Sequence, residues 1–330
     1  MNERTLRIAT RRSKLALAQS HWIQAQLEAR HPGLRVELRE YVTRGDQIQD
    51  VPLHQVGGKG LFTKEVEDAL LSGEADLAVH SLKDLPSEQP EGLILAAVPE
   101  REDPRDALVL PAGAAVPEAV SIDPLVPSPA LAALPSGARV GSSSLRRSSQ
   151  LLHARPDLRV ESVRGNVDTR LRKLDEGQYD VLILAAAGLR RLGLESRISA
   201  PLPVELSTPA PGQGALGIEC RADDPVTREL LAVLDHAPTR HAVLAERALM
   251  EAFGGGCSIP LGGYARIDGE VMHVLGVVAS ADGSCVFREA TSGRVEEAAE
   301  LGRTVARQLI EAGAGEIIRP AGDAGAGSPD

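Results

Sequence analysis

The sequence predicts an α/β protein in which two α/β units face each other across a cleft, followed by a smaller C-terminal α+β domain. Two observations carry this prediction. Strand-like and helix-like hydrophobic periods alternate from residue 6 to 98 and again from 139 to 185, as in sheets whose strands are joined by helices. From about Thr239 the order changes to a long helix, a glycine loop, three strands and a final helix. The 330-residue chain is long enough for several domains.

The first unit begins with the apolar stretch Leu6–Ala9, which predicts a strand and resembles no signal peptide. A helical period from Ser13 to Ala29 follows and ends at Pro32-Gly33. Further strands are expected at 34–38, 75–79 and 92–98, with a helix at 62–71. The Pro-bounded stretch 99–104 then predicts a hinge.

The second unit repeats this order. Strands are expected at 108–110, 139–140, 159–163 and 179–185, and helices at 144–154 and 167–176. A second Pro/Gly-rich crossing, 208–214, precedes the apolar run 215–218. The segment 111–136, with six prolines and seven alanines, lacks apolar periodicity and predicts an inserted surface loop.

These breaks define the expected domains. The first is discontinuous, 1–100 with 212–236; the second spans 104–208 and contains the 111–136 insertion; the third spans 237–319, and 320–330 should form a disordered tail. Three strands are expected in the third domain near Tyr264, Val274 and Val286, before a helix at 295–312.

Arginine is concentrated between Arg139 and Arg172, where eight arginines stand against three acids, with no lysine and no aromatic residue. Guanidinium groups bind carboxylate or phosphate oxygens bidentately, so the cluster predicts a pocket for a polyanion. A solvated, salt-bridged helix face is the alternative. Nucleic acid is disfavoured as the ligand, because aromatic residues make up 2% of the chain and its formal net charge is -10.

Polar residues follow four predicted strands: Thr10–Ser13, His80–Asp84, Gly141–Arg147 and Val163–Arg170. Open α/β sheets bind ligands beyond the carboxyl ends of their strands, so these segments should converge on one site. Asp84 is the lone acid among cations there. It is either a turn residue paired with Lys83 or a carboxylate that stabilises positive charge developing on a substrate.

Cys257 lies in the glycine-rich stretch Gly254–Pro260 and is one of three cysteines, with Cys220 and Cys285. An odd number without a C-x-x-C pair favours a reducing cytoplasm, and no metal site is expected. The residue is either a small side chain in a tight turn or a covalent attachment site. The longest apolar stretch, 181–189, is about half the length that a bilayer requires.

Taken together, the motifs resemble those of the porphobilinogen deaminase family over residues 6–319. They are RIATR at 7–11, VGGKGLF at 56–62, AVHSLKD at 78–84, SSLRR at 143–147, RGNV at 164–167, PGQGA at 211–215 and GGC at 255–257. The resemblance implies two periplasmic-binding-protein-like α/β domains and an enzyme that joins four porphobilinogens head to tail, with loss of ammonia, and releases hydroxymethylbilane.

The same resemblance implies roles for individual residues. Cys257 would hold a dipyrromethane cofactor through a thioether, while Asp84 and Lys83 would be catalytic. The other implied cofactor-binding residues are Ser13, Lys83, Ser142, Ser144, Arg146, Arg147 and Arg170, and the implied substrate-binding residues are Arg11, Ser81, Arg164, Arg170 and Arg191. Lys59 and Phe62 would belong to a lid formed by residues 48–60. A cytoplasmic monomer that hands its product to uroporphyrinogen III synthase is the expected partner arrangement.

Two features depart from the family pattern. Asp168 stands where a small residue is expected and should pair with Arg164 or Arg170; the insertion 111–136 is unusually long. A competing hypothesis is a two-domain anion-binding protein of the periplasmic transport type, because the same architecture serves both functions. That protein would carry a secretion signal and no covalent adduct.

Overall fold

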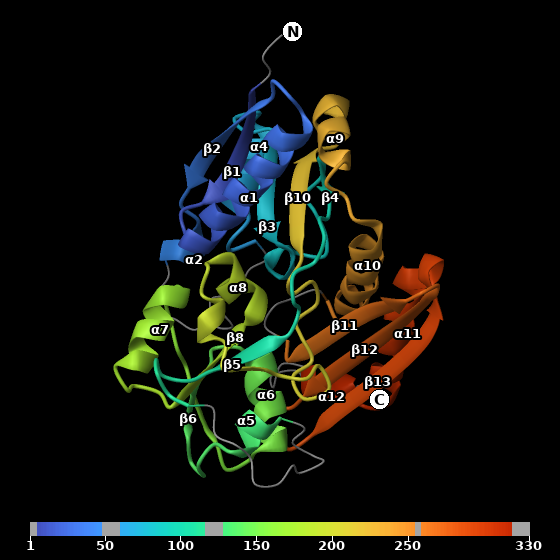
Figure 1. The fold of residues 1–330 in the computed structure, drawn as a ribbon. Coiled ribbons are helices and arrows are strands. Elements are labelled where there is room, and N and C mark those ends of the chain that lie inside the picture. The colour runs from blue at the N-terminus through green and yellow to red at the C-terminus, as the bar shows by residue number, and fades with distance from the viewer. Residues whose placement is uncertain (1–4, 48–59, 116–127, 255–258, 319–330) are drawn as a thin grey trace, which may run out of the picture.

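The computed structural model describes residues 5–47, 60–115, 128–254 and 259–318. Figure 1 shows two five-stranded sheets, one above the other, with an orange and red three-stranded sheet beside the lower one. This arrangement confirms the predicted fold class of two α/β units and a smaller α+β unit.

The first sheet has the strand order β2-β1-β3-β10-β4. Its strands are β1 (Thr5–Arg11), β2 (Arg35–Tyr41), β3 (Leu77–Ser81), β4 (Leu93–Ala97) and β10 (Leu216–Arg221). β1 runs parallel to β2 and β3, and β10 runs antiparallel to β3 and β4. Helices α1 (Lys14–Arg30) and α9 (Pro225–Ala232) pack on one face and α4 (Lys64–Leu71) on the other. Two short helices, α2 (Arg44–Gln47) and η1 (Leu82–Asp84), complete the unit.

The second sheet has the order β7-β6-β8-β5-β9. Its strands are β5 (Asp106–Val109), β6 (Arg139–Gly141), β7 (Arg159–Glu161), β8 (Val181–Ala185) and β9 (Ala200–Pro201). One face is covered by α5 (Pro129–Ala132) and α6 (Leu145–Ala154), and the other by α7 (Val167–Asp175) and α8 (Ala186–Arg191); η2 (Glu195–Arg197) follows α8. In both sheets three parallel strands are followed by an antiparallel one, β10 or β5, so the two units share one topology.

The chain passes twice between the two sheets, from β4 to β5 and from β9 to β10. Each passage supplies the antiparallel strand of the sheet that it enters. The predicted hinge and the second Pro/Gly crossing coincide with these passages. The exact domain limits stay a prediction.

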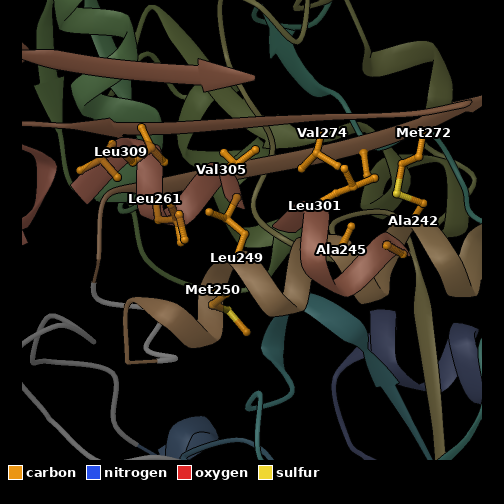
Figure 2. Packing of buried hydrophobic residues seen from close by; sticks show 14 of the residues in the cluster. Ala242, Ala245, Leu249, Met250, Leu261, Met272, Val274, Leu301, Val305 and Leu309 are labelled. Carbon is orange, nitrogen blue, oxygen red and sulfur yellow. The ribbon is translucent and has the colours of Figure 1, made fainter. Parts of the chain in front are cut away.

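The C-terminal unit is the antiparallel sheet β11 (Leu261–Asp268), β12 (Val271–Ala279) and β13 (Val286–Arg294), packed on two helices. Helix α10 (Ala237–Ala252) precedes the sheet in the chain, and η3 (Val295–Glu297) joins β13 to α11 (Ala298–Glu311), which is followed by α12 (Ala314–Ile318). In Figure 2, Leu249 of α10, Val274 of β12 and Val305 of α11 extend into one apolar core. Gly302 lets α11 approach α10 closely, because a Cβ there would collide with the carbonyl of Ala245.

The surface-loop interpretation of 111–136 is wrong for its last third. Ser128 caps α5 by accepting a hydrogen bond from the Leu131 amide at 3.4 Å. Leu131 is fully buried and packs with Leu134 in the core shared by β5, β6 and α6. Two apolar residues on a capped turn were enough to bury a face, which the proline and alanine content of the segment concealed. Residues 116–127 lie outside the described residues.

Replacing Leu131 with alanine is therefore expected to lower the free energy of unfolding by about 2–5 kcal/mol, the usual cost of truncating a buried leucine. Pro135→Ala, at an exposed position nearby, is the matched control and should change it by less than about 0.5 kcal/mol. Denaturant unfolding of both variants tests this. Equal stabilities would restore the surface-loop interpretation.

Candidate functional site

A cleft of about 280 Å³ lies between the two sheets, at the ends of their parallel strands. It is lined from the first unit by the ends of β1 and β3 and from the second by α6, α7 and α8. The lining residues include Arg11, Ser13, Lys14, Phe62, Ser81, Lys83, Asp84, Arg147, Asp168, Arg170 and Arg191. Nine of these were predicted from the sequence as site residues. Six of the residues that line it are cationic and two are carboxylates, so the cleft suits a ligand with several negative charges.

The first unit contributes the residues around Asp84. Arg11 ends β1, and its guanidinium lies 4.3 Å from the centre of the Phe62 ring, a cation–π contact. Ser13 caps α1 by accepting a hydrogen bond from the Ala16 amide at 3.2 Å. Asp84 closes the short helix η1 after β3, and it is exposed to the cleft. The carboxylate is therefore accessible to a ligand.

The arginine pair of α6 is held by a carboxylate that was not among the predicted site residues. Asp106, fully buried at the start of β5, accepts hydrogen bonds from Arg146 at 2.8 and 3.2 Å and from Arg147 at 2.8 Å. Arg146 also donates to the carbonyl of Thr208 at 2.6 Å. These guanidinium groups hold the pKa of Asp106 far below its usual range, although burial acts in the opposite direction.

The two arginines differ in what they face. Arg147 lines the cleft, whereas Arg146 is buried at 5% exposure and is absent from the cleft wall. The guanidinium of Arg146 is bound to Asp106 and Thr208, and its role in cofactor binding stays a prediction. One buried carboxylate fixes both side chains, and Arg147 alone reaches the cleft.

Gln213 connects the two walls of the cleft. Its Nε2 donates to the carbonyl of Pro104 at 2.7 Å and to Asp106 at 2.9 Å. Its Oε1 accepts from Lys83 Nζ and from Arg147, both at 3.3 Å. The amide therefore ties Lys83 of the first unit to the arginine network of the second.

Lys83 is half-buried beside these cations. Burial, and next the positive charge of Arg147, lower its pKa from 10.5 to about 8. The negative charges of Asp84 and Asp106 act in the opposite direction and are outweighed. A ligand carboxylate bound beside Lys83 would favour its charged form and raise its pKa.

Two further arginines contribute charge to the cleft. Burial, followed by the nearby guanidinium groups of Arg147 and Arg164, lowers the pKa of Arg170 to about 10. Burial likewise lowers the pKa of Arg191 to about 10, and its guanidinium donates to the Gly214 carbonyl at 2.6 Å. Arg164 is near enough to repel Arg170 but is absent from the described cleft wall.

Three of the four remaining arginines of the predicted cluster have carboxylate partners. Arg139 pairs with Asp180 at 2.9 Å, Arg155 with Asp157 at 2.7 Å and Arg172 with Glu176 at 3.5 Å. The salt-bridge alternative is correct for these three.

The serines of the SSLRR region lie at the turn into α6, where the Ser144 amide donates to Ser142 Oγ at 3.3 Å. Ser142 and Ser144 are not among the described residues that line the cleft.

Asp168 does not pair with Arg164 or Arg170, as the sequence suggested. Its carboxylate lies 2.9 Å from Lys14 Nζ, across the cleft at the start of α1. Lys14 lies on the other domain, a neighbour that local spacing could not reveal. The hydrogen bond from Lys14 holds the pKa of Asp168 below its usual range.

Cys257 and Lys59 lie outside the described residues, and so do residues 48–59 of the predicted lid. The chain is described again from Ile259 onward. On β11, Gly262 packs so closely on Thr208 that a Cβ would meet its carbonyl oxygen at 2.8 Å. Since that carbonyl also accepts from Arg146, the start of β11 lies beside the arginine pair.

Among the described residues, no group of histidine, cysteine, aspartate and glutamate side chains is arranged to hold a metal ion. No helix in the same ranges is both long and apolar enough to span a bilayer.

Comparison with known proteins places these motifs in a family. A model described as "Porphobilinogen deaminase, dipyromethane cofactor binding domain" matches residues 6–229, and one described as "Porphobilinogen deaminase, C-terminal domain" matches residues 241–311. The porphobilinogen deaminase of Pelobacter propionicus is 51% identical over 318 residues, covering 96% of this chain and 97% of the relative. That of Geobacter metallireducens is 50% identical over 318 residues, with 96% and 95% covered.

Among solved structures, the periplasmic aliphatic sulphonate binding protein SsuA from Escherichia coli matches with a TM-score of 0.38 and 14% identity, covering 94% of this chain and 88% of that one. A likeness this weak supports no conclusion about the ligand. The two family models, and the relatives that match over nearly the full length, show that the chain belongs to the porphobilinogen deaminase family.

Proposed function

We propose that the protein condenses four porphobilinogen molecules head to tail on a covalent dipyrromethane primer and releases hydroxymethylbilane. The observation that carries the proposal is the cleft with six cationic side chains around the exposed carboxylate of Asp84. Every pyrrole of the substrate carries two carboxylic acids, so the growing product is a polycarboxylate that such a cleft attracts.

The cofactor fits the residues present. Half-buried Lys83, Arg170 and Arg191 have lowered pKa values, which acidic groups on a ligand would reverse. We assign cofactor binding to Ser13, Lys83, Ser142, Ser144, Arg146, Arg147 and Arg170, with Arg146 acting through its network, and covalent attachment to Cys257. When bound, the dipyrromethane supplies the terminal ring to which the first substrate is joined.

Substrate binding is assigned to Arg11, Ser81, Arg164, Arg170 and Arg191. As ammonia leaves, positive charge appears on the substrate ring, and the Asp84 carboxylate stabilises it by accepting the pyrrole N–H. Lys83 holds a substrate or cofactor carboxylate next to Asp84. Phe62, stacked on Arg11, and Lys59 are assigned to the lid. The Gly45 amide donates to the Leu61 carbonyl at 2.8 Å, so the described residues on either side of the lid lie next to each other.

The expected setting is a cytoplasmic monomer that needs neither metal, membrane nor nucleic acid. Its linear product would pass to uroporphyrinogen III synthase. The low aromatic content and net negative charge support the exclusion of nucleic acid.

An assay of purified protein with porphobilinogen tests the function. Four ammonia molecules should be released for each tetrapyrrole. A binding protein of the transport type would bind the substrate and release no ammonia, which would refute the proposal.

The cofactor's electrostatic role predicts opposite effects of Lys83→Met in two backgrounds. In Cys257→Ser protein without the adduct, the charged lysine is disfavoured in the fold, so its removal should stabilise by on the order of 2 kcal/mol at pH 7. The pKa of Lys83 is about 8 in the folded protein, below its ordinary value of 10.5. The stability gained by removing the lysine should therefore shrink as pH rises from 8 and vanish above 10.5. In adduct-bearing protein the same substitution should destabilise.

Denaturant unfolding across this pH range measures the effect. Lys64→Met, at an exposed lysine on α4, is the matched control and should show no such dependence. A Lys83→Met effect of one sign in both backgrounds would contradict contact between Lys83 and the cofactor acids.

A further inference from the structure

A buried histidine lies immediately behind the Asp84 segment. His80 ends the run of buried residues in β3, and Glu219 lies on the neighbouring strand β10. The His80 Nε2 and a Glu219 carboxylate oxygen are 2.9 Å apart, without the alignment of a good hydrogen bond. Glu219 is fully buried and His80 is 7% exposed.

A second carboxylate, Glu67 of α4, packs near the pair. Burial raises its pKa, and the negative charge of Glu219 acts in the same direction, while His80 opposes both. The negative charge of Glu219 acts on Arg247 of α10. The Arg247 guanidinium, however, donates its hydrogen bonds to the carbonyls of Leu85, Pro86 and Ser87. The cluster therefore holds two buried acids and one imidazole.

Such a cluster lowers the stability of the folded protein. One oxygen of Glu67 and both oxygens of Glu219 lack a hydrogen-bond partner among the described residues. Buried carboxylates in this state destabilise a protein relative to apolar side chains of similar volume. Stability alone therefore does not account for their presence.

A small cavity joins the cluster to the site. It has a volume of about 60 Å³, enough to admit water, and both His80 and Asp84 line it. Arg11, Ser81 and Thr63 complete the polar part of its wall. A proton on Asp84 therefore has a short polar route to the imidazole.

We infer that His80, which lies beside Glu219, is a proton relay that accepts through water the proton collected by Asp84 in each condensation. This inference rests on the proposed function. In each cycle the substrate's C–N bond breaks and its electron pair leaves with ammonia. The acceptor ring then forms the C–C bond, and its C–H bond breaks and returns an electron pair to the ring. The released proton passes to Asp84, then to His80, and finally to ammonia or solvent, so no oxidant or reductant is needed.

The test uses holoenzyme and porphobilinogen deuterated at the free ring carbon that loses its proton. His80→Gln is expected to reduce kcat about 100-fold, at the lower end for lost acid–base catalysis, with KM little changed. The deuterium isotope effect on turnover should rise above that of wild type, because proton removal becomes slower. A structural role would lower kcat without raising the isotope effect.

Glu219→Gln keeps the side-chain volume and should show the same isotope signature more weakly. His21→Gln, at an exposed histidine on α1, is the matched control and should behave as wild type. Asp84 and Arg11 line this cavity with His80, and the acids Glu67 and Glu219 lie beside the imidazole.

An isotope effect that is unchanged in His80→Gln would overturn the relay. Failure of wild type to release ammonia would instead overturn the proposed function. The two failures are thus distinguishable.

Discussion

Replacing Cys257 with serine is expected to abolish both the covalent adduct and turnover. A hydroxyl is a far weaker nucleophile than a thiolate, so the primer cannot be attached. Without the acids of the cofactor, the cations of the cleft repel one another, and the variant should also unfold more easily than wild type. Intact mass, turnover and denaturant unfolding measure the three effects.

Cys220 and Cys285 provide matched controls. Cys220 is buried in β10, and burial raises the pKa of its thiol to about 11, so it is a poor nucleophile. Cys285 is exposed. Serine at position 285 should leave adduct and activity unchanged, and a normal adduct on the Cys257→Ser protein would contradict the assignment.

Replacing Asp84 with asparagine should reduce turnover by roughly 10²–10³-fold while leaving the fold and the attached cofactor intact. Removal of one preorganised electrostatic group from an active site has effects of this size. The side chain is exposed and ends a short helix, so its amide analogue should cost little stability. Steady-state kinetics together with intact mass separate lost chemistry from lost cofactor.

Asp84→Glu is the conservative comparison and should retain more activity than Asp84→Asn, because it keeps the charge. Asp168→Asn removes the other carboxylate of the cleft wall, whose partner is Lys14, and should have a much smaller effect. If Asp84→Asn were within a few-fold of wild type, Asp84 would be a turn residue.

Much of the fold was predictable because hydrophobic periodicity reports local burial. The expected helix at 13–29 is α1, and the expected strands near Tyr264, Val274 and Val286 are β11, β12 and β13. Helix α5 was missed because four residues and one serine cap are too short for a periodic pattern. What buries that turn is contact with Leu151 and Leu108, distant in the sequence.

The site was predictable where position after a strand decides it. Arg11, Ser13, Ser81, Lys83 and Asp84 all lie at or just after the ends of parallel strands and meet at the cleft. Partners across the cleft could not be predicted, since Asp106 holds Arg146 and Arg147 from a strand 40 residues away in the chain. The one sequence signal for Asp106 is that an acidic residue directly precedes the apolar run 107–110. The one signal for Gln213 is that a polar side chain stands between two glycines.

The central claim, that a dipyrromethane is covalently bound at Cys257, is tested most directly by the intact mass of the purified wild-type protein, followed by peptide mapping. The account predicts a mass above that of the bare chain by two linked pyrrole units, with the excess on the peptide that contains Cys257. The mass of the bare chain, or the same excess on a peptide containing Cys220 or Cys285, would contradict it.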